Sequence, residues 1–584
     1  MQLDLAKGSR SRLLAIVMLL IMAVFIVRLF YLQVIRNEFY KTAAMQEQQR
    51  QFVLPAERGE IYTLDAGTPV KLVMNETVYT VFADPKIIKN TKPIVEAIRS
   101  IAGGNAKANL EELLSAKERR YQVLATKVSL KQTEMLKAKK LSGLGFQRET
   151  QRVYPEGQLA AQTLGYVNAE GKGQYGIEGA LDERLKGKDG LLKTVADVRD
   201  VPLTIGKENI LTPEDNGDNV VMTIDRNIQS YTEKALVDGL QRTGATHGSV
   251  MVMDPQSGRV MAMANYPTYN PAKLSEIQDF AVVNNGTISE PYEAGSVIKT
   301  LTMATGIDMG VVAPNSTYNN TDSIKVEGET IKNATKGHTG NITYQKAMNY
   351  SLNTAFVTIA QLLGNGSYIT EQARNTIYSY FHDRLGLGEV TGIELAGEAK
   401  GIVRSPKDQY GGAVQYSNMV FGQGMNVTMV QVCAAFSAVI NGGNYYTPTV
   451  IAGTINDDGT TFDAAKPNLS RSAVVSPKTS DQVRQMVLDA RREFYANRDT
   501  QGFFVGGKTG TSETLQDSGY VDDVTVGSYL GFGGDSASSD GPKYVIMVRV
   551  SGKDLNLGGS TDAMPIFTDI SNWMIDYMKL QPKG

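Results

Sequence analysis

The chain has 584 residues, 42% of them hydrophobic and 21% charged, a composition typical of a folded protein with more than one domain. Its 59 Lys and Arg residues nearly balance 61 Asp and Glu residues, so overall charge gives no reason to expect nucleic-acid binding. The single cysteine, Cys433, excludes an intramolecular disulfide, and its apolar surroundings predict a buried, inert thiol.

An apolar segment near the N-terminus, 13–35, is about as long as a helix that crosses a bilayer. Three basic residues precede it: Lys7, Arg10 and Arg12. The positive-inside rule therefore predicts a cytoplasmic tail, 1–12, and a single-pass protein of the cell membrane whose bulk is extracytoplasmic. A cleaved signal peptide is the alternative, but its apolar core would be shorter and a small-x-small site would follow closely. Arg28 interrupts the segment, and we expect it to snorkel to the outer interface or to pair with a partner helix.

The next segment, 40–205, mixes short strand-like runs with basic stretches that favour helix. One such stretch, 109–136, is rich in Leu, Glu, Lys and Ala and is expected to be helical. No P-loop and no strand-flanked dinucleotide fingerprint occurs among the glycines of this segment.

From residue 215 to 584 the pattern is that of one large α/β domain. Val220 to Ile224 alternates like a strand and leads through Asp225 into a helix. The runs 248–254 and 259–264 are rich in β-forming residues, and the Pro-Gln-Ser-Gly sequence between them predicts a hairpin.

The end of the chain again combines predicted strands with a predicted helix. Residues 528–532 and 544–550 are predicted strands, and apolar residues recur at helical spacing over 565–580. We expect this last stripe to pack on the sheet as core rather than to form a cofactor site.

Three short motifs occur once each in a fixed order: Ser296-Val-Ile-Lys299, Ser351-Leu-Asn353 and Lys508-Thr-Gly-Thr511. Considered alone, the first motif is compatible with the N-cap of a helix, the second with a surface loop and the third with a lysine on an edge strand. All three motifs in this order are hard to obtain by chance. A serine becomes a nucleophile when a base takes its proton, and a buried lysine with a lowered pKa can be that base. The spacing of Ser296 and Lys299 predicts one helix face, with the N-terminal N–H groups placed as an oxyanion hole.

The histidines offer no competing site. His247, His338 and His382 are far apart in sequence, lack metal-ligand spacing and do not lie in a nucleophile-elbow context.

The chain resembles class B, monofunctional penicillin-binding proteins, whose motif set these three strings match. Further matching strings run from the anchor to the C-terminus: Arg58-Gly-Glu-Ile-Tyr, Tyr154-Pro-Glu-Gly, Gly176-Ile-Glu-Gly, Thr223-Ile-Asp225, Asp254-Pro-Gln-Ser-Gly258, Tyr292-Glu-Ala-Gly-Ser296, Gly422-Gln-Gly424 and Gly531-Phe. The resemblance implies one membrane helix, an α+β pedestal or dimerisation domain over 40–205, and a transpeptidase domain over 215–584 with a five-stranded sheet between helices.

The resemblance also implies the roles of the motif residues. Ser296 would attack the penultimate D-alanine carbonyl of a peptidoglycan stem peptide, with Lys299 as its base. Ser351 would relay the proton to the leaving amine, and Asn353 would hold Lys299 and the substrate. Lys508, Thr509, Gly510 and Thr511 would bind the terminal carboxylate, and the N–H groups of Ser296 and Thr511 would form the oxyanion hole.

The partners that the resemblance implies are stem peptides of the lipid-linked precursor polymer, β-lactam antibiotics, a SEDS-type membrane glycosyltransferase and other division or elongation proteins. No metal or diffusible cofactor is expected. The compact pedestal favours the septal branch, and a side-wall role is the alternative.

Two departures from the family pattern concern the pedestal and the catalytic loop. Ala294 stands where the family usually has proline, and Thr63-Leu-Asp-Ala-Gly67 replaces its usual Asp-Arg-Asn-Gly turn. Three rival functions remain. A β-lactamase would need a deacylating Glu loop, a β-lactam sensor would need a cytoplasmic signalling segment, and a bifunctional synthase would need a glycosyltransferase domain.

Overall fold

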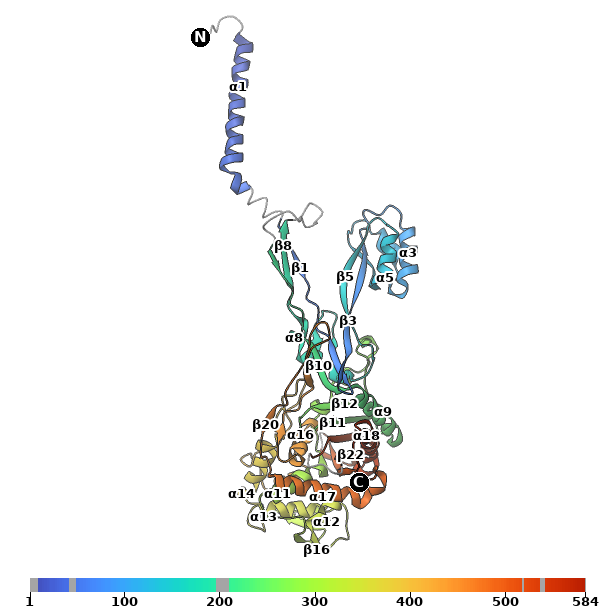
Figure 1. Cartoon of the computed structure of the whole chain (residues 1–584), viewed down its shortest axis with the longest axis vertical. Helices are drawn as coiled ribbons and strands as arrows, with labels where there is room; N and C mark the ends of the chain where they lie inside the picture. The colour runs from blue at the N-terminus through green and yellow to red at the C-terminus, as the bar shows by residue number, and fades with distance from the viewer. Residues whose placement is uncertain (1–8, 41–48, 196–209, 517–518, 536–540, 583–584) are drawn as a thin grey trace. The chain divides into compact units, whose positions relative to one another are not determined.

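A computed structural model describes residues 9–40, 49–195, 210–516, 519–535 and 541–582. Its coordinates separate into two compact units, one of residues 1–57 with 187–217 and one of residues 58–186 with 218–584 (Figure 1). Most of the predicted cytoplasmic tail, 1–8, lies outside the described residues, as do 41–48 and 196–209 of the predicted pedestal.

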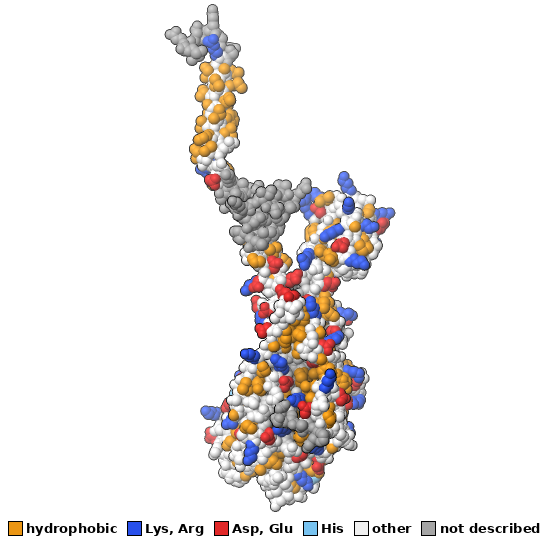
Figure 2. Space-filling view, viewed as in Figure 1, with side chains coloured by type: hydrophobic (Ala, Val, Ile, Leu, Met, Phe, Trp, Pro, Cys, Tyr) orange, Lys and Arg blue, Asp and Glu red, His pale blue; other side chains and the backbone are white. Residues whose placement is uncertain are grey.

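The first unit carries the apolar helix. Helix α1 (Ser9–Phe30) continues into the π-helical turn η1 (Tyr31–Ile35), and within it 24 residues, Arg12–Ile35, are long and apolar enough to cross a membrane, judged by length and composition. Hydrophobic side chains surround this helix (Figure 2), as expected of a surface that faces lipid. The Arg28 guanidinium lies 5.7 Å from the ring centroid of Tyr31, which is the type of residue found at a bilayer interface.

A small antiparallel sheet completes the first unit. Its strands lie in the order β1 (Gln49–Leu54), β8 (Gly190–Val195) and β9 (Ile210–Thr212). Two chain segments separated by more than a hundred residues thus pair, with Leu54 opposite Gly190.

The second unit begins with a sheet that joins distant parts of the sequence. Its strand order is β19-β18-β10-β2-β3-β4, and β5 also pairs with β3. The bounds are β2 (Ile61–Asp65), β3 (Thr68–Ala83), β4 (Gln122–Ser129), β5 (Leu144–Val153), β10 (Asn219–Asp225), β18 (Ile451–Ile455) and β19 (Phe462–Ala464). The strand predicted at 220–224 is therefore present as β10, and it pairs in parallel with β2, so segments 40–205 and 215–584 share one sheet.

The altered turn at Thr63-Leu-Asp-Ala-Gly67 forms a tight hairpin between β2 and β3. Asp65 pairs with Thr68, and the two residues between them, Ala66 and Gly67, have φ values of +47° and +88°. Left-handed backbone at both positions matches the twist of a two-residue hairpin.

A small helical cluster covers one end of β3 and β4. It contains α3 (Lys92–Ala102), α4 (Leu110–Ser115) and α5 (Leu130–Ala138) around a core of its own. The expected helix over 109–136 is wrong in its middle, where β4 runs from Gln122 to Ser129. The β-branched residues Val123, Thr126 and Val128 favour a strand there, and Ser129 then starts α5 with a reciprocal capping box to Gln132.

The second sheet of this unit has five antiparallel strands in the order β12-β11-β23-β22-β21. Their bounds are β11 (His247–Met253), β12 (Val260–Tyr266), β21 (Phe504–Gln516), β22 (Gly519–Gly534) and β23 (Tyr544–Ser551). The predicted hairpin of β11 and β12 and the two predicted late strands are confirmed.

Helices cover both faces of this sheet, so apolar residues of its inner strands are buried on both sides. Along β11, Val250 and Val252 pack into the core formed with α9 (Arg226–Thr243) and α18 (Met564–Tyr577), whereas Met251 and Met253 pack on the opposite face. Asp225 caps α9 by accepting from the backbone N–H groups of Asn227 and Ile228, as predicted. The apolar residues predicted at helical spacing over 565–580 lie on α18 and pack in this core, as expected.

The opposite face carries the helices that position the motifs: α11 (Lys299–Asp308), α16 (Met429–Ile440) and α17 (Pro477–Tyr495). Smaller helices surround them: α12 (Tyr344–Asn349), α13 (Asn353–Leu362), α14 (Glu371–Tyr378) and α15 (Ala413–Met419). Cys433 is fully buried in α16, and burial raises the pKa of its thiol, which confirms the inert role predicted for it.

Candidate active site

Ser296 lies in a short 3₁₀ turn, Gly295–Ile298, that leads directly into α11 at Lys299. Gly295 has φ +62° and donates its N–H to the carbonyl oxygen of Gly422 at 3.0 Å. A Cβ on Gly422, which has φ +93°, would lie 1.9 Å from Gly295 O. The two glycines therefore let two backbones approach more closely than any other residue pair allows.

The edge strand β21 closes the other side of this turn. A Cβ on Gly295 would lie 2.6 Å from Thr511 O, and one on Gly510 would lie 2.8 Å from Ala294 O. Ser528 of β22 donates its hydroxyl to Ala294 O at 3.2 Å. Ala294 is fully buried and its carbonyl is bound, so the missing family proline leaves the turn held by the sheet.

Lys299 is the centre of the polar contacts. Its Nζ is bonded to Ser351 O at 2.7 Å, to Asn353 Oδ1 at 2.7 Å and to Ser351 Oγ at 3.0 Å. The residue is fully buried, and burial holds the pKa of its amine well below the usual value, an effect increased by the positive charge of Lys508. Sequence reasoning placed Lys299 within reach of Ser296; that direct contact stays a prediction.

The Ser351 backbone is held in the left-handed region, with φ +57°. Such a conformation costs a non-glycine residue on the order of 1–2 kcal/mol, and it aims both the carbonyl and the hydroxyl of Ser351 at Lys299. Helix α13 begins two residues later at Asn353.

Lys508 approaches the same hydroxyl from β21. Its Nζ lies 2.9 Å from Ser351 Oγ and 3.1 Å from Thr509 O. Burial lowers the pKa of Lys508 to about 7. Lys299 and Lys508 both contact the Ser351 hydroxyl, so a positive charge on one of them disfavours a positive charge on the other.

The acceptors around Lys299 define which atoms carry protons. Ser351 O and Asn353 Oδ1 only accept, so each takes an N–H bond from Lys299. Ser351 Oγ accepts from Lys299 Nζ at 3.0 Å and from Lys508 Nζ at 2.9 Å. The Ser351 hydroxyl therefore connects the two amines, and the arrangement can pass a proton between Lys299 and Ser351.

An asparagine platform, formed by Asn320, Asp322 and Asn333, holds Thr354 at the start of α13, directly after Asn353. Asn333 Oδ1 accepts from Thr354 N at 3.0 Å, and Asn320 Oδ1 accepts from Thr354 Oγ1 at 2.8 Å. Asn333 Nδ2 in turn donates to Asn320 Oδ1 at 3.0 Å, and Asn333 and Asn320 are 2% and 1% exposed. Sequence reasoning missed this platform, because Asn and Asp between short strands are indistinguishable from ordinary turn residues.

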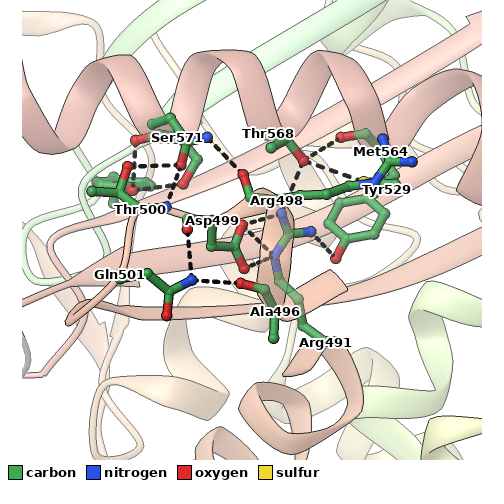
Figure 3. Close-up of polar contacts among 12 residues, drawn as sticks. Arg491, Ala496, Arg498, Asp499, Thr500, Gln501, Tyr529, Met564, Thr568 and Ser571 are labelled. Carbon is green, nitrogen blue, oxygen red and sulfur yellow. Dashed lines mark hydrogen bonds and ion pairs between the residues drawn. The ribbon is translucent and has the colours of Figure 1, made fainter. Parts of the chain in front are cut away.

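A buried arginine ties together three elements of the second unit (Figure 3). Arg491 of α17 is fully buried, and its guanidinium is paired with the Asp499 carboxylate at 2.5 Å. Arg491 Nη1 donates to Tyr529 Oη at 2.6 Å and Nη2 donates to Thr568 Oγ1 at 2.9 Å, which ties α17, β22 and α18 together. Sequence reasoning missed this residue too, since an arginine on a helix is normally exposed.

The other predicted site residues lie along β21 and its edge. Thr509 is half-buried beside Lys508, Gly510 faces Ala294, and Thr511 Oγ1 accepts from Gly559 N at 3.3 Å. As the outer strand of the sheet, β21 offers backbone groups without a strand partner to a ligand. Within the described ranges no group of three or more His, Cys, Asp or Glu side chains could hold a metal ion.

Comparison with known proteins agrees with this geometry. The penicillin binding protein transpeptidase domain matches residues 248–572, and the penicillin-binding protein dimerisation domain matches residues 53–222. Stage V sporulation protein D of Bacillus subtilis is 27% identical over 581 residues, covering 98% of this chain and 87% of that protein. The peptidoglycan D,D-transpeptidase FtsI of Escherichia coli is 25% identical over 590 residues, covering 98% and 92%.

Solved structures show the same fold. Penicillin-binding protein 2X from Streptococcus thermophilus superposes with a TM-score of 0.72 at 21% identity, covering 91% of this chain and 80% of that one. Penicillin-binding protein 3 from Mycobacterium tuberculosis, solved with aztreonam, has a TM-score of 0.66 at 24% identity, covering 91% and 98%. The chain therefore belongs to the penicillin-binding protein family, as a member that joins the family's dimerisation domain to its transpeptidase domain.

Proposed function

We propose that the chain is a serine peptidoglycan D,D-transpeptidase, anchored in the cell membrane, that cross-links stem peptides through an acyl-enzyme on Ser296. The observation that carries the proposal is the buried contact of Lys299 with Ser351 and Asn353, while Lys508 reaches the same Ser351 hydroxyl. Relatives named as peptidoglycan D,D-transpeptidases align with nearly the whole chain.

Acylation uses the neutral amine of Lys299. The Ser296 hydroxyl gives its proton to Lys299 while its Oγ attacks the carbonyl carbon of the penultimate D-alanine. The N–H groups of Ser296 and Thr511 stabilise the oxyanion, and Lys508 with Thr509 and Thr511 holds the terminal carboxylate.

The leaving group then takes a proton from the relay. The proton moves from Lys299 through the Ser351 hydroxyl to the amine nitrogen of the terminal D-alanine, and the C–N bond breaks. An amine of a neighbouring stem peptide next attacks the Ser296 ester, so that a new amide forms and Ser296 recovers its proton. A β-lactam reacts at the same ester-forming step but keeps its leaving group tethered.

Intact-mass measurement after incubation of the full chain with penicillin tests the nucleophile. One stable adduct is expected on the wild type and on Ser472→Ala, an exposed control, and none on Ser296→Ala. An adduct that persists in Ser296→Ala would overturn the assignment. Rapid turnover of penicillin by the wild type would instead favour the β-lactamase alternative.

The membrane topology and the cellular role follow from the anchor and the relatives. Basic residues before the apolar helix favour a cytoplasmic N-terminus and an extracytoplasmic catalytic domain. We place the enzyme in septal wall synthesis, because FtsI of Escherichia coli and PbpB of Mycobacterium tuberculosis are among the relatives. A fluorescent fusion should form a ring at midcell, and patches along the cylinder would support the side-wall role.

A monofunctional transpeptidase needs its glycan made by another protein, and a SEDS-type glycosyltransferase in the same membrane is the partner we propose. Arg28 is costly within a bilayer unless it snorkels or is paired. Loss of partner pull-down in Arg28→Leu would support pairing, and unchanged pull-down and growth would support snorkelling.

A further inference from the structure

A cavity of about 320 Å³ opens beside the relay, on the side of Lys508. Ser351, Lys508 and Thr509 border it at one end, and Ser296 is not among its lining residues. Its volume lies within the range of small-molecule sites. The cavity therefore borders the hydroxyl that would deliver a proton to the leaving D-alanine.

The floor of the cavity is fixed by the buried arginine described above. Tyr529 lines the cavity, and its phenol oxygen accepts from Arg491 Nη1 at 2.6 Å (Figure 3). A Cβ on Gly507 would lie 2.2 Å from that phenol oxygen, so only glycine lets β21 lie against it. The ion pair of Arg491 with Asp499 holds this floor in one position.

The walls combine an aromatic side with a polar rim. Tyr350 packs against the His338 ring at 3.9 Å and edge-on against the Phe494 ring at 5.4 Å. Phe494 lines the cavity and is 45% exposed, so its ring is accessible to a ligand. Thr335 and Ser560 supply hydroxyl groups at the rim.

Microscopic reversibility indicates which group of the second substrate lies at the mouth of this cavity. Transfer to an amine is the reverse of the step that expels D-alanine, so the incoming nitrogen occupies the position of the outgoing one. That position lies against Ser351 and Lys508, at the mouth of the cavity. A neighbouring stem peptide would place its amine at Ser351 and the side chain or residue that carries this amine against Tyr350 and Phe494.

We propose that this cavity, the acceptor cavity, binds the amine-bearing segment of the neighbouring stem peptide during cross-linking; the inference rests on the proposed transpeptidase function. In the step itself, the acceptor nitrogen bonds to the acyl carbon and the bond from that carbon to Ser296 Oγ breaks. The proton lost by the nitrogen passes through the Ser351 hydroxyl and Lys299 to Ser296 Oγ. No further reactant is needed.

The test measures how the acyl-enzyme partitions between water and an amine. The full chain, in detergent, receives N-benzoyl-D-alanyl thioglycolate as donor and one of two acceptor types. These are free D-alanine and synthetic stem tetrapeptides that carry lysine or diaminopimelate at the third position. The ratio of amide to acid product is read by chromatography, and acylation is followed separately with fluorescent penicillin.

Two variants change the cavity and two matched variants do not. Phe494→Ala removes the aromatic wall and Thr335→Trp fills the rim, whereas Glu493→Ala and Lys336→Trp change neighbouring exposed positions that do not line it. We expect both cavity variants to lower the amide-to-acid ratio with stem tetrapeptides at least tenfold. The ratio with D-alanine and the acylation rate should change less than threefold, and both controls should match the wild type.

Other outcomes overturn the inference. An unchanged ratio in both cavity variants places the acceptor elsewhere. An equal loss with D-alanine and with tetrapeptides reduces the cavity to an exit for the leaving group. If the cavity variants lose acylation together with the amide-to-acid ratio, the cavity binds the donor peptide instead. Failure of the wild type to be acylated by penicillin or thioester refutes the proposed function itself, which is a distinct result.

Discussion

The side-chain oxygen of Asn353 lies 2.7 Å from Lys299 Nζ, and the amide nitrogen of the same residue donates to Lys332 O at 2.9 Å. The second bond fixes the orientation of the amide, so Asn353 presents an uncharged acceptor to a lysine whose pKa is lowered by burial. A carboxylate at this position would favour the ammonium form instead.

Asn353→Asp should therefore raise the pKa of Lys299 and slow acylation at neutral pH by roughly a hundredfold, the scale of general-base catalysis. The rate of reaction with fluorescent penicillin, measured against pH, should show its acid limb at higher pH than in the wild type. Asn353→Ala removes the acceptor without adding charge and should not move the limb upward. An acid limb that stays in place in Asn353→Asp would refute the role of Lys299 as base.

Lys508 should set the alkaline limb of the same profile. Its pKa is lowered to about 7, so the ammonium that we propose to bind the carboxylate of penicillin is lost as pH rises through that value. The second-order acylation rate should fall above about pH 7. Lys508→Arg keeps its charge at all these pH values and should move the limb upward, even if its geometry lowers the maximum rate. The same limb in both proteins would exclude Lys508 as its source.

The asparagine platform predicts a positioning effect. Asn333→Ala leaves the Thr354 N–H without its 3.0 Å acceptor and loosens the start of α13. We expect acylation to slow about tenfold, the effect of about 1.4 kcal/mol, which is within the usual cost of an unsatisfied buried group. Asn333→Asp restores an acceptor oxygen and should recover part of the rate. Lys325→Ala, at an exposed position of the neighbouring hairpin, is the control; equal effects of Asn333→Ala and Lys325→Ala would remove the platform from catalysis.

Arg491→Met should destabilise the transpeptidase domain strongly. It leaves the Asp499 carboxylate buried without its cation, and breaking such a pair typically costs about 3–5 kcal/mol. Thermal unfolding of the full chain should show a lower melting temperature for this domain. Arg492→Met, at the exposed next position of α17, should leave it nearly unchanged. Similar melting temperatures for both variants would mean that the arginine does not brace the sheet.

Gly422→Ala tests the close approach behind the nucleophile. Its new Cβ would fall 1.9 Å from Gly295 O, and the residue would keep a φ of +93°. The turn that carries Ser296 must then move, so penicillin acylation should drop at least a hundredfold, as expected when a nucleophile is displaced by about an ångström. Gly412→Ala meets no atom within 4 Å and is the control, with acylation close to that of the wild type. Normal acylation by Gly422→Ala would show that the turn adapts.

Local pattern determined much of the second unit. Alternation and turn residues located β11 and β12, the apolar spacing located α18, and Asp225 marked the start of α9. These signals are local because strand and helix periods and caps are set by neighbouring residues. The region 109–136 shows the limit, since composition suggested helix while pairing with β3 made Gln122–Ser129 a strand.

The three motifs named the chemical groups of the site, and only the tertiary structure decided what those groups can do. Ser351 lies 52 residues from Lys299 and 157 from Lys508 in sequence, yet the amines of both lysines contact the Ser351 hydroxyl. The low pKa of Lys299, the inward-facing Arg491 and the asparagine platform all come from burial among distant segments. Burial and long-range partners have no local signature, because they depend on how strands and helices pack together rather than on which residues adjoin in the chain.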